Sequence, residues 1–436
     1  MRLREPLKDD VAKVPVLQNA WGTFRRWQLQ GEYASRREYY AKLARQQGFV
    51  YREADVTTAI RSRLASRGYV PTVRGMGEVH TFAFIPRLGW HSALYPDLEE
   101  LGPVTEFDYA EHGYGPEEFL RRDRRAAERR REMNDSFLAA LREAHRRRPV
   151  DWVFVYASGL EVRAQLIRAI VDELGIPVVN MCLDDKQSWT GPMLEGQHLG
   201  QVDIAAAFDL CWTSARVACE WYLAENARPI YMPEGFDIST YKPMDVNQDI
   251  PISFIGGAYG FRPSIIRYLK RHQIPIHVFG TGWHTRPVWG QEQVSIINRS
   301  VINLGMGGIG YSESLTNVKT RDFEIPGVGG GVYLTSFNPD LAQHFSIGQE
   351  ILCYRNREEM LELTRYYLSR PEEARAIALR GRERCLAEHR WLHRYRRVCE
   401  ILGVLAEGEP GAPEAPYAEK NIHENVSAYA GRQHSF

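Results

Sequence analysis

Residues 319–336 combine the side chains that suit a sugar nucleotide. Two cations and two carboxylates lie within six positions: Lys319, Arg321, Asp322 and Glu324. A glycine cluster that includes Gly329 and Gly330 follows, and then a short apolar strand at 332–334. Cations at the mouth of a parallel sheet suit a diphosphate, and a carboxylate accepts hydrogen bonds from sugar hydroxyls. The alternative is a surface ion pair before a strand, because exposed charge clusters are common.

Similar residues follow the other strands that we predict in this half of the chain. The strands at 252–255 and 276–279 lead into the following residues: Gly256, Gly257, Tyr259 and Arg262 after the first, and Gly280 and Trp283 after the second. The strand at 301–304 leads into a glycine-rich run at 305–310. Glycines let a phosphate approach the backbone, a helix N-terminus adds amides and a positive dipole, and arginine adds a bidentate contact. An aromatic ring there could pack on a nucleobase or cap the edge of the sheet.

Alternating strands and helices must position these residues. The predicted strands lie at 81–86, 103–109, 152–157, 177–183, 210–213 and 230–232, and again at 252–255, 276–279, 301–304, 332–335 and 351–354. The predicted helices lie at 92–101, 116–148, 161–174, 216–226, 262–272, 291–299, 317–325, 358–369, 371–387 and 390–404. This order implies an α/β protein with two doubly wound parallel sheets that face one another. Ligands are expected at the carboxyl ends of the strands, in the cleft between the sheets.

The chain outside this alternation is predicted to be helical or flexible. Ser35 and Glu38 form a capping-box pattern that predicts a helix start, and Asp55 could cap a second helix that Gly68 ends. The short polar stretch 243–251 predicts a linker. We therefore expect an N-terminal helical accessory segment (1–79), a first Rossmann-like domain for the acceptor (80–243), a second for the donor (244–389), a C-terminal helix (390–405) and a flexible tail (406–436).

The predicted helix at 116–148 carries many arginines around a sparse apolar stripe. Pro116 suits its first turn, and Arg146 and Arg148 suit its last turn. At 1.5 Å per residue it would be about 50 Å long. We interpret the basic face as solvent-exposed and paired with glutamates. The alternative is a surface for an anionic acceptor.

The composition excludes several classes of protein. The 436 residues are too many for one ordinary core, and 44% hydrophobic with 25% charged residues is typical of a soluble globular protein. Net charge is zero, so no global charge demands nucleic acid or an acidic membrane. No apolar run approaches the roughly 20 residues that span a bilayer, and residues 1–10 contain no apolar export signal. Six cysteines without a C-x-x-C pair fit a reducing cytoplasm and argue against zinc.

Several motifs together resemble the CgeB-type (spore-maturation-like) glycosyltransferases of the GT-B fold. They are the Lys-x-Arg-x-Phe-Glu-Ile-Pro pattern from Lys319, the pair Leu334-Thr335, the Phe345-x-x-Gly-x-Glu350 stretch and Tyr354. Residues 178–186, 208–214, 233–237 and 252–257 are similar to the same family. The resemblance extends over roughly residues 150–400, weakens over 80–149, and does not include 1–79 or the tail.

The resemblance implies a metal-independent transferase with no cofactor, which uses a nucleotide-diphosphate sugar as co-substrate. Glu324 would bind the nucleotide ribose or the donor sugar. Arg262, Lys319 and Arg321 would neutralise the diphosphate as it leaves. Related retaining enzymes carry another glutamate eight positions before the equivalent of Glu324, where this chain has Thr316.

An inverting reaction would also need a general base beside the acceptor hydroxyl. His91 follows the first strand, and histidine can titrate near neutrality. Asp185 and Glu234 follow strands at the same edge and are rival candidates. A structural role is the alternative for each. Asp184 and Asp185 could bind a metal ion. The sequence contains no Asp-x-Asp motif, however, so a structural or acceptor-side role is the better interpretation.

Three other functions stay open at this stage. The first is a glycosyltransferase acting on modified DNA bases, which the arginine-rich helix supports and zero net charge opposes. The others are a non-catalytic sugar-nucleotide-binding protein and a sugar-nucleotide epimerase. The acceptor could be a glycan, a small molecule, a protein or a nucleic acid, and the oligomeric state is open.

Overall fold

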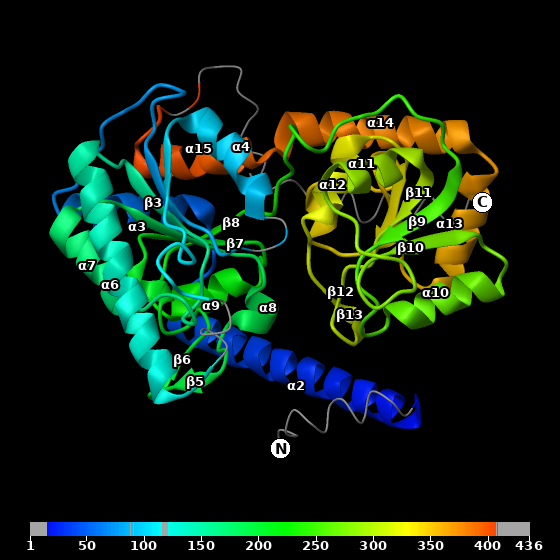
Figure 1. The fold of residues 1–436 in the computed structure, drawn as a ribbon. Helices are drawn as coiled ribbons and strands as arrows, with labels where there is room; N and C mark the ends of the chain where they lie inside the picture. The colour runs from blue at the N-terminus through cyan, green and yellow to red at the C-terminus, as the bar shows by residue number, and fades with distance from the viewer. Residues whose placement is uncertain (1–14, 88, 90, 116–120, 407, 409–436) are drawn as a thin grey trace. The chain divides into compact units, whose positions relative to one another are not determined.

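The computed structural model describes residues 15–87, 89, 91–115, 121–406 and 408. The chain divides into two compact units, each built on its own parallel sheet (Figure 1). The first-sheet unit contains Tyr40–Ser239 together with residues 385–406. The second-sheet unit contains Thr240–Arg384 together with residues 15–39.

The first sheet has six strands in the order β2-β1-β3-β4-β7-β8, and all neighbouring strands are parallel. The strands are β1 (Thr81–Phe84), β2 (Val104–Glu106), β3 (Trp152–Val155), β4 (Val178–Cys182), β7 (Leu210–Thr213) and β8 (Pro229–Tyr231). Every residue of β1, β3, β4, β7 and β8 is buried. This burial explains their unbroken apolar sequences, because helices cover both faces of such a sheet.

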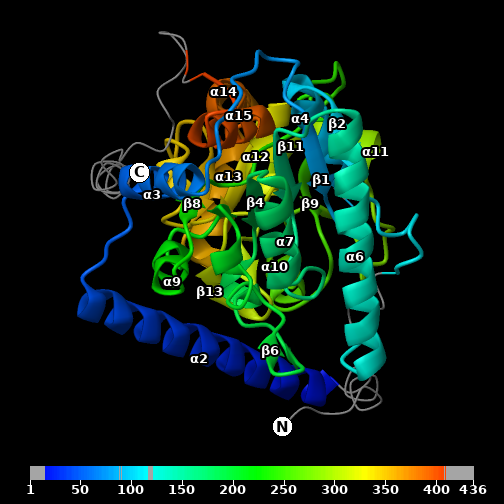
Figure 2. The same ribbon diagram turned by 90° about the vertical axis from the view of Figure 1, so that its left-hand side faces the viewer.

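Alternate residues of these strands face different helices. Trp152 and Phe154 share a core with residues of α3 (Glu53–Ser66), α4 (Tyr95–Leu101) and α15 (Trp391–Leu402). Phe82 and Phe84 instead meet Phe137 of α6 (Arg124–Arg147), with ring centroids 5.3 and 5.7 Å apart. Helix α7 (Ala164–Leu174) lies beside α6 (Figure 2).

Shorter elements connect these layers. They are η1 (His91–Leu94), α8 (Asp185–Ser188), η2 (Ala205–Ala207), α9 (Ala218–Ala224) and the hairpin of β5 (Met193–Leu194) with β6 (Gln197–His198). Of these, α8 directly follows β4 and so places Asp185 at the carboxyl edge of the first sheet.

The second sheet has five strands in the order β10-β9-β11-β14-β15, again all parallel. The strands are β9 (Ile250–Ile255), β10 (Ile276–Phe279), β11 (Ser300–Leu304), β14 (Val332–Ser336) and β15 (Leu352–Tyr354). Helix α10 (Arg262–Arg271) contacts α13 (Arg357–Leu368), whereas α11 (Gly290–Arg299) contacts α12 (Arg321–Val328). Helix α14 (Pro371–Glu388) and the short η3 (Leu341–Gln343) complete this unit.

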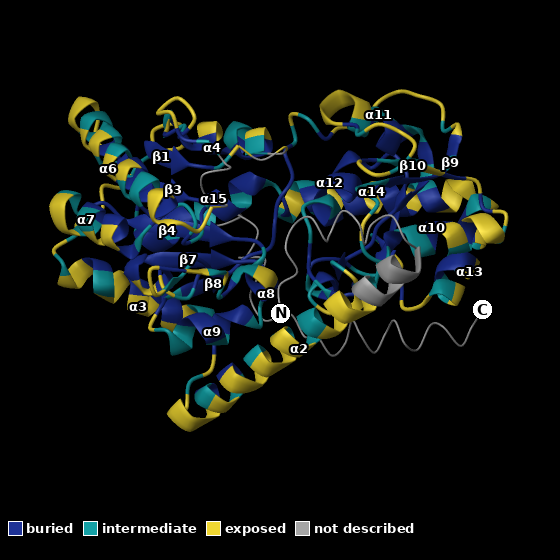
Figure 3. Cartoon of the chain, turned by 60° about the horizontal axis from the view of Figure 1, so that its bottom comes forward, coloured by how far each residue is buried: buried dark blue, intermediate teal, exposed yellow. Residues whose placement is uncertain are grey.

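Helix α2 (Pro15–Gln47) is long and carries many exposed side chains (Figure 3). Its residue Gln30 donates hydrogen bonds to Ser312 (2.8 Å) and Ser314 (3.0 Å) of the second-sheet unit. These serines belong to the hairpin of β12 (Gly308–Ile309) with β13 (Ser312–Thr316). In the first-sheet unit, Tyr40 accepts a hydrogen bond of 2.8 Å from Trp189. Among the described residues, no helix is both long and apolar enough to cross a membrane.

The predicted order of elements along the chain and the α/β class are confirmed, but several helix boundaries are wrong. Asp55 lies inside α3, which begins at Glu53, so it does not cap that helix. Ser35 lies inside α2, so it does not cap a helix start. Helix α6 begins at Arg124, because Asp123 accepts a hydrogen bond from the backbone of Ala126; residues 116–120 lie outside the described residues. The helix expected at 317–325 begins at Arg321, because β13 extends to Thr316.

Most arginines of α6 pair with glutamates, as the sequence predicts, but Arg130 is buried and donates to the carbonyl of Gly159. Six of them form ion pairs with glutamates: Arg124 with Glu128, Arg129 with Glu132, Arg131 with Glu195, Arg142 with Glu173, and Arg146 and Arg147 with Glu143. The interpretation of a solvent-exposed, glutamate-paired face is confirmed for these six. Their charge is therefore largely balanced within the protein.

Candidate functional site

A buried arginine, Arg262, and a half-buried one, Arg321, meet at the carboxyl edge of the second sheet. Gly256 follows β9, Arg262 begins α10 and Arg321 begins α12. A Cβ atom added to Gly256 would lie 3.3 Å from Nη1 of Arg262 and 3.3 Å from Nη1 of Arg321. The two guanidinium groups therefore converge on one glycine, as the sequence predicts for a diphosphate-binding edge.

Neither guanidinium is neutralised by a carboxylate of the described residues. Arg262 is 2% exposed, its Nη1 donates a 3.2 Å hydrogen bond to the carbonyl of Gly257, and its Nε has no hydrogen-bond partner. Nη1 of Arg321 is also buried without a hydrogen-bond partner. Burial, and next the charge of Arg321, lowers the pKa of Arg262 to about 10. Two like charges with buried, unused donors are the arrangement expected of an anion site.

The helix that begins at Arg262 adds to this positive potential. Helix α10 spans Arg262–Arg271, and its first turn lies next to the same loop. Pro263 has no amide, and the amides of Arg262 and Ser264 donate to the carbonyls of Tyr259 and Phe261, so the helix contributes its dipole rather than free amides. A helix N-terminus carries roughly half a positive charge, which favours bound phosphate. The guanidinium pair and the helix dipole thus act on the same edge of the sheet.

Three aromatic residues hold the loop and the guanidinium in place. The ring of Tyr259 lies 4.1 Å from the guanidinium carbon of Arg262, and that of Phe254 lies 5.6 Å from it. The indole of Trp283 donates a 2.7 Å hydrogen bond to the carbonyl of Gly256. This contact favours the reading in which Trp283 caps the sheet edge. Tyr259 remains 51% exposed.

The glycines after β9 and β10 pack against each other. A Cβ atom on Gly280 would lie 2.4 Å from the carbonyl oxygen of Gly256, well inside van der Waals contact. Gly280 also has φ +142°, which disfavours other residues. The two loops therefore approach so closely that only glycine fits at Gly280.

The segment from Lys319 to Arg321 is held by Asp322, to which the sequence analysis assigned no role. The buried carboxylate of Asp322 accepts a 2.8 Å hydrogen bond from the backbone of Lys319 and another from the hydroxyl of Tyr333. Burial raises the pKa of Asp322, although both hydrogen bonds oppose that rise. An aspartate three residues after a loop start is the local signal for such a turn. Tyr333, eleven residues later, gives no such signal.

Three other predicted donor residues are placed differently. Glu324 is buried one turn after Arg321 in α12. Gly329 and Gly330 precede β14, so they lie at the amino end of that strand rather than at the carboxyl edge. A Cβ atom on Gly329 would lie 2.9 Å from the side chain of Arg382, and one on Gly330 would lie 2.4 Å from a backbone atom of the neighbouring helix α11. These contacts explain the two glycines by packing, and the structure does not bring them to Arg262.

At the carboxyl edge of the first sheet, Asp185 is fully enclosed. It accepts hydrogen bonds from the hydroxyls of Tyr222 (2.7 Å) and Thr213 and has no exposed surface. Burial raises the pKa of Asp185 to about 6, against the effect of these hydrogen bonds. Both carboxylate oxygens already serve donors of the same unit. This geometry favours a structural role, and a catalytic role for Asp185 stays a prediction.

The two remaining base candidates also belong to the first-sheet unit. His91 is half-buried at the start of η1, after β1. Glu234 is buried after β8, in a segment whose carbonyls at Pro233 and Glu234 accept hydrogen bonds from Arg394. Their catalytic roles stay predictions. Within the described ranges, no three His, Cys, Asp or Glu side chains are grouped to hold a metal ion.

Comparison with protein families identifies a glycosyltransferase-like region that includes most of the second sheet. Residues 262–400 match the model of a family described as glycosyl transferase-like. The matched region begins at Arg262 and includes Arg321. The chain therefore contains a glycosyltransferase-like domain. A search of curated proteins found no matching sequence.

Solved structures with a similar fold cover most of the chain. Anabaena HepE in complex with UDP-glucose has a TM-score of 0.50 at 8% identity, over 75% of this chain and 100% of that one. Sucrose-phosphate synthase from Thermosynechococcus elongatus has a TM-score of 0.48 at 11% identity, over 74% and 99%. A trehalose-phosphate synthase from Burkholderia xenovorans has a TM-score of 0.44 at 12% identity, over 74% and 100%. The fold is GT-B, as predicted, with two Rossmann-like sheets and an N-terminal helix.

Proposed function

We propose that this protein transfers a sugar from a nucleoside diphosphate sugar to an acceptor, and that Arg262 and Arg321 bind the diphosphate. The observation that carries the proposal is the convergence of their guanidiniums on Gly256 without a carboxylate to neutralise them. Arg262 and Arg321 lie within the matched glycosyltransferase-like region, at the edge of a parallel sheet where such ligands bind. Assignment to the CgeB-type subfamily rests on the sequence motifs alone.

The chemistry follows from where negative charge develops. When the bond between the sugar and the diphosphate breaks, the leaving nucleoside diphosphate gains negative charge. Donors fixed in advance near that charge stabilise the transition state more than the ground state. Arg262 is fixed by its carbonyl contact and by the ring of Tyr259. We infer that this guanidinium pair replaces a divalent metal in neutralising the leaving group.

The roles of Glu324 and of the general base are proposed from the chemistry of their side chains. Glu324 is proposed to accept hydrogen bonds from donor hydroxyls. His91 and Glu234 are the preferred base candidates of the first-sheet unit, because the oxygens of Asp185 are occupied. All six cysteines are buried thiols. Buried thiols are usual in a reducing compartment, and we propose a cytoplasmic location on that basis and on the sequence.

The alternative function, glycosyl transfer to modified DNA bases, loses its main support. Six arginines of α6 form ion pairs with glutamates, so their charges are not available to bind phosphates. Phosphate-binding surfaces need uncompensated cations. The acceptor class therefore stays open among glycans, small molecules and proteins, with nucleic acid least favoured.

Thermal unfolding in the presence of UDP, GDP, dTDP and CMP tests the proposal. One nucleotide should raise Tm, because a ligand of the native state stabilises it by mass action. UDP is the first candidate, since HepE was crystallised with UDP-glucose. Arg262→Met should remove the shift, whereas Arg267→Met, an exposed arginine of the same helix, should keep it. No shift with any of the four nucleotides would contradict the proposal.

A second measurement separates an enzyme from a sensor. Hydrolysis of the donor without acceptor should be detectable and should fall in Glu324→Ala and Lys319→Ala. Binding of nucleotide without any hydrolysis or transfer would favour the non-catalytic alternative.

A further inference from the structure

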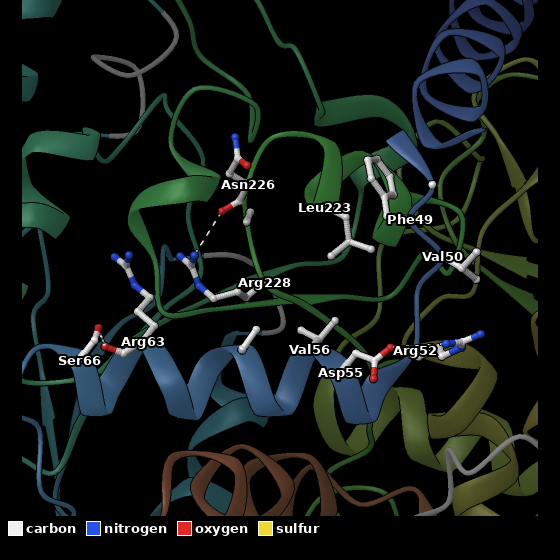
Figure 4. Close-up of a pocket in the computed structure, with 13 residues that line it drawn as sticks. Phe49, Val50, Arg52, Asp55, Val56, Arg63, Ser66, Leu223, Asn226 and Arg228 are labelled. Atoms are coloured by element: carbon white, nitrogen blue, oxygen red, sulfur yellow. Dashed lines mark hydrogen bonds and ion pairs between the residues drawn. The ribbon is translucent and has the colours of Figure 1, made fainter. Parts of the chain in front are cut away.

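A groove of about 740 Å³ runs along α3 in the first-sheet unit (Figure 4). We call it the α3 groove. Arg63 and Arg228 lie at one end, and Phe49 and Val50 lie toward the other. Its volume falls within the range of roughly 300–1,000 Å³ that is usual for small-molecule sites.

The α3 groove lies at the amino edge of the first sheet. Arg228 directly precedes β8, and Asp209 directly precedes β7. Asp185 and Glu234 follow strands of the same sheet and so lie at the opposite edge. A ligand in this groove would therefore not occupy the edge at which we expect the acceptor.

The polar end of the groove contains more positive than negative charge. The fully buried carboxylate of Asp209 forms ion pairs with Arg63 (3.0 Å) and Arg67 (3.1 Å). The carbonyl of the same residue accepts a 3.0 Å hydrogen bond from Arg228. Two guanidiniums thus pair with one carboxylate, and the third, that of Arg228, donates to backbone carbonyls. Arg63 and Arg228 line the groove, whereas Arg67 and Asp209 lie behind its wall. Nε and Nη1 of Arg67 are buried and have no hydrogen-bond partner.

Burial and neighbouring positive charge both disfavour the charged form of Arg228. Burial, and next the charge of Arg63, lowers the pKa of Arg228. An anion near these groups would relieve the repulsion between them. Arg63 is well placed to meet it, because its side chain is 35% exposed and lines the groove.

The rest of the groove is mainly apolar, apart from the exposed ion pair of Arg52 and Asp55 (3.9 Å) near its far end. Val56, Ala59 and Leu223 line its centre, and Val50 is 65% exposed beside them. An exposed valine gains stability when an apolar group covers it. The groove therefore offers a cationic end and an apolar wall to the same ligand.

We propose that the α3 groove binds a small organic anion with an apolar body, with its acidic group at Arg63 and Arg228 and its body against Val50, Val56 and Leu223. This site is separate from the guanidinium pair of the second sheet and does not depend on the proposed function. A carboxylate or a phosphate monoester supplies the acidic group equally well, and a hydrocarbon or aromatic group supplies the body. The chemistry at both ends is required for tight binding.

Phenyl phosphate tests the proposal as a probe that carries both parts. In calorimetric titrations, inorganic phosphate tests the acidic group alone and benzyl alcohol tests the body alone. We expect phenyl phosphate to bind at one site, about tenfold or more tightly than either partial probe, because each part adds binding free energy. Equal affinity for phenyl phosphate and inorganic phosphate, or no binding of phenyl phosphate, would overturn the proposal.

Two variants on one helix locate the binding site. Ala59→Glu places a bulky anion inside the groove at an exposed helix position, and should weaken phenyl phosphate binding about tenfold or more. Ala54→Glu adds the same charge at an exposed position of α3 outside the groove, and should change the affinity by less than about twofold. Similar losses in both variants would show a general charge effect and would overturn the proposal.

Saturating UDP separates this site from the guanidinium pair. The affinity for phenyl phosphate should be unchanged in UDP, and unchanged in Arg262→Met. Competition by UDP, together with insensitivity to Ala59→Glu, would place phenyl phosphate at the donor site and would reject the α3 groove. Failure of UDP to bind at all would contradict the proposed function and leave the phenyl phosphate result unaffected.

Discussion

Arg262 and Asp185 are both buried ionisable residues that follow strands of a parallel sheet, but their surroundings differ. Asp185 accepts hydrogen bonds from Thr213 and Tyr222, so its charge is satisfied within the first-sheet unit. Arg262 keeps an unused donor, and its nearest charged neighbour is another arginine. Burial alone therefore does not mark a functional residue. The informative feature is whether the protein itself supplies the partners.

The comparison predicts opposite effects of neutralising the two residues. Removing an internally satisfied charge should alter stability and its pH dependence without altering ligand binding. Removing an uncompensated charge should alter ligand binding, while the apoprotein loses little stability because a buried repulsion disappears.

The largest expected effect concerns Asp185 and pH. Its folded-state pKa of about 6 lies above the ordinary 3.8, so the native state binds the proton more tightly than the unfolded state does. The contribution of this group to stability is therefore greatest below about pH 4 and falls as pH rises to about 6, by about 3 kcal/mol in total. Urea unfolding of Asp185→Asn from pH 4 to 7 should lack this fall.

Thr213→Val provides the matched variant for this prediction. It removes one hydrogen bond to the ionised carboxylate while keeping the shape of the side chain. The pKa of Asp185 should rise further, and the loss of stability should extend to higher pH. If Asp185→Asn unfolds with the same pH dependence as the wild type, the assignment of a structural, titrating Asp185 is refuted.

The second prediction concerns Arg262→Met. UDP affinity should fall about 30-fold, or about 2 kcal/mol, because a charge-assisted hydrogen bond to phosphate is lost. Tm of the apoprotein should stay the same or rise, because a desolvated charge beside Arg321 is removed. Titration calorimetry and thermal unfolding measure the two quantities, with Arg267→Met as the control. A lower Tm with unchanged UDP affinity would make Arg262 the structural residue and would reverse the comparison.

The sequence predicts well the strands that form the carboxyl edges of the two sheets. The bounds of β7 (Leu210–Thr213) and β10 (Ile276–Phe279) agree with the predicted strands, because each is a short apolar run between polar stretches. The alternation of such runs with helical patterns leaves few topologies other than two parallel sheets. Gly256 follows β9 and Arg262 begins α10, which are the positions in the secondary structure that the sequence predicts.

The sequence predicts less about elements whose order depends on distant contacts. The hairpin β12–β13 was not predicted, because its glycine-rich first strand offers no periodic pattern. Gly329 and Gly330 share a segment with Arg321, yet α12 carries the chain to the opposite edge of the sheet between them. Nothing local shows that Asp185 would meet Thr213 and Tyr222, or that Asp322 would meet Tyr333. Separating structural from functional carboxylates therefore required the fold.

Asp322 extends the comparison to a residue that is satisfied internally but supports the anion site. Asp322→Asn keeps the shape of the side chain and one acceptor oxygen, so one of its two hydrogen bonds is lost. The turn that carries Arg321 should loosen, and UDP affinity should fall about fivefold, or about 1 kcal/mol. Tyr333→Phe should act similarly. Calorimetry of the double variant should show less than the sum of the two effects, because both remove the same contact; strictly additive losses would argue against this linkage.

The smallest expected effect separates the ring of Tyr259 from its hydroxyl. The ring lies 4.1 Å from the guanidinium carbon of Arg262 and remains 51% exposed, so its contribution should be that of an exposed cation–π contact. Such contacts are worth about 0.5–1 kcal/mol. Tyr259→Leu should therefore weaken UDP binding by roughly two- to fivefold in calorimetric titrations. Tyr259→Phe keeps the ring and should bind UDP like the wild type. Equal losses of UDP affinity in both variants would mean that the hydroxyl, rather than the ring, connects Tyr259 to the ligand. The position of Arg262 would then depend only on its burial and on its hydrogen bond to the Gly257 carbonyl.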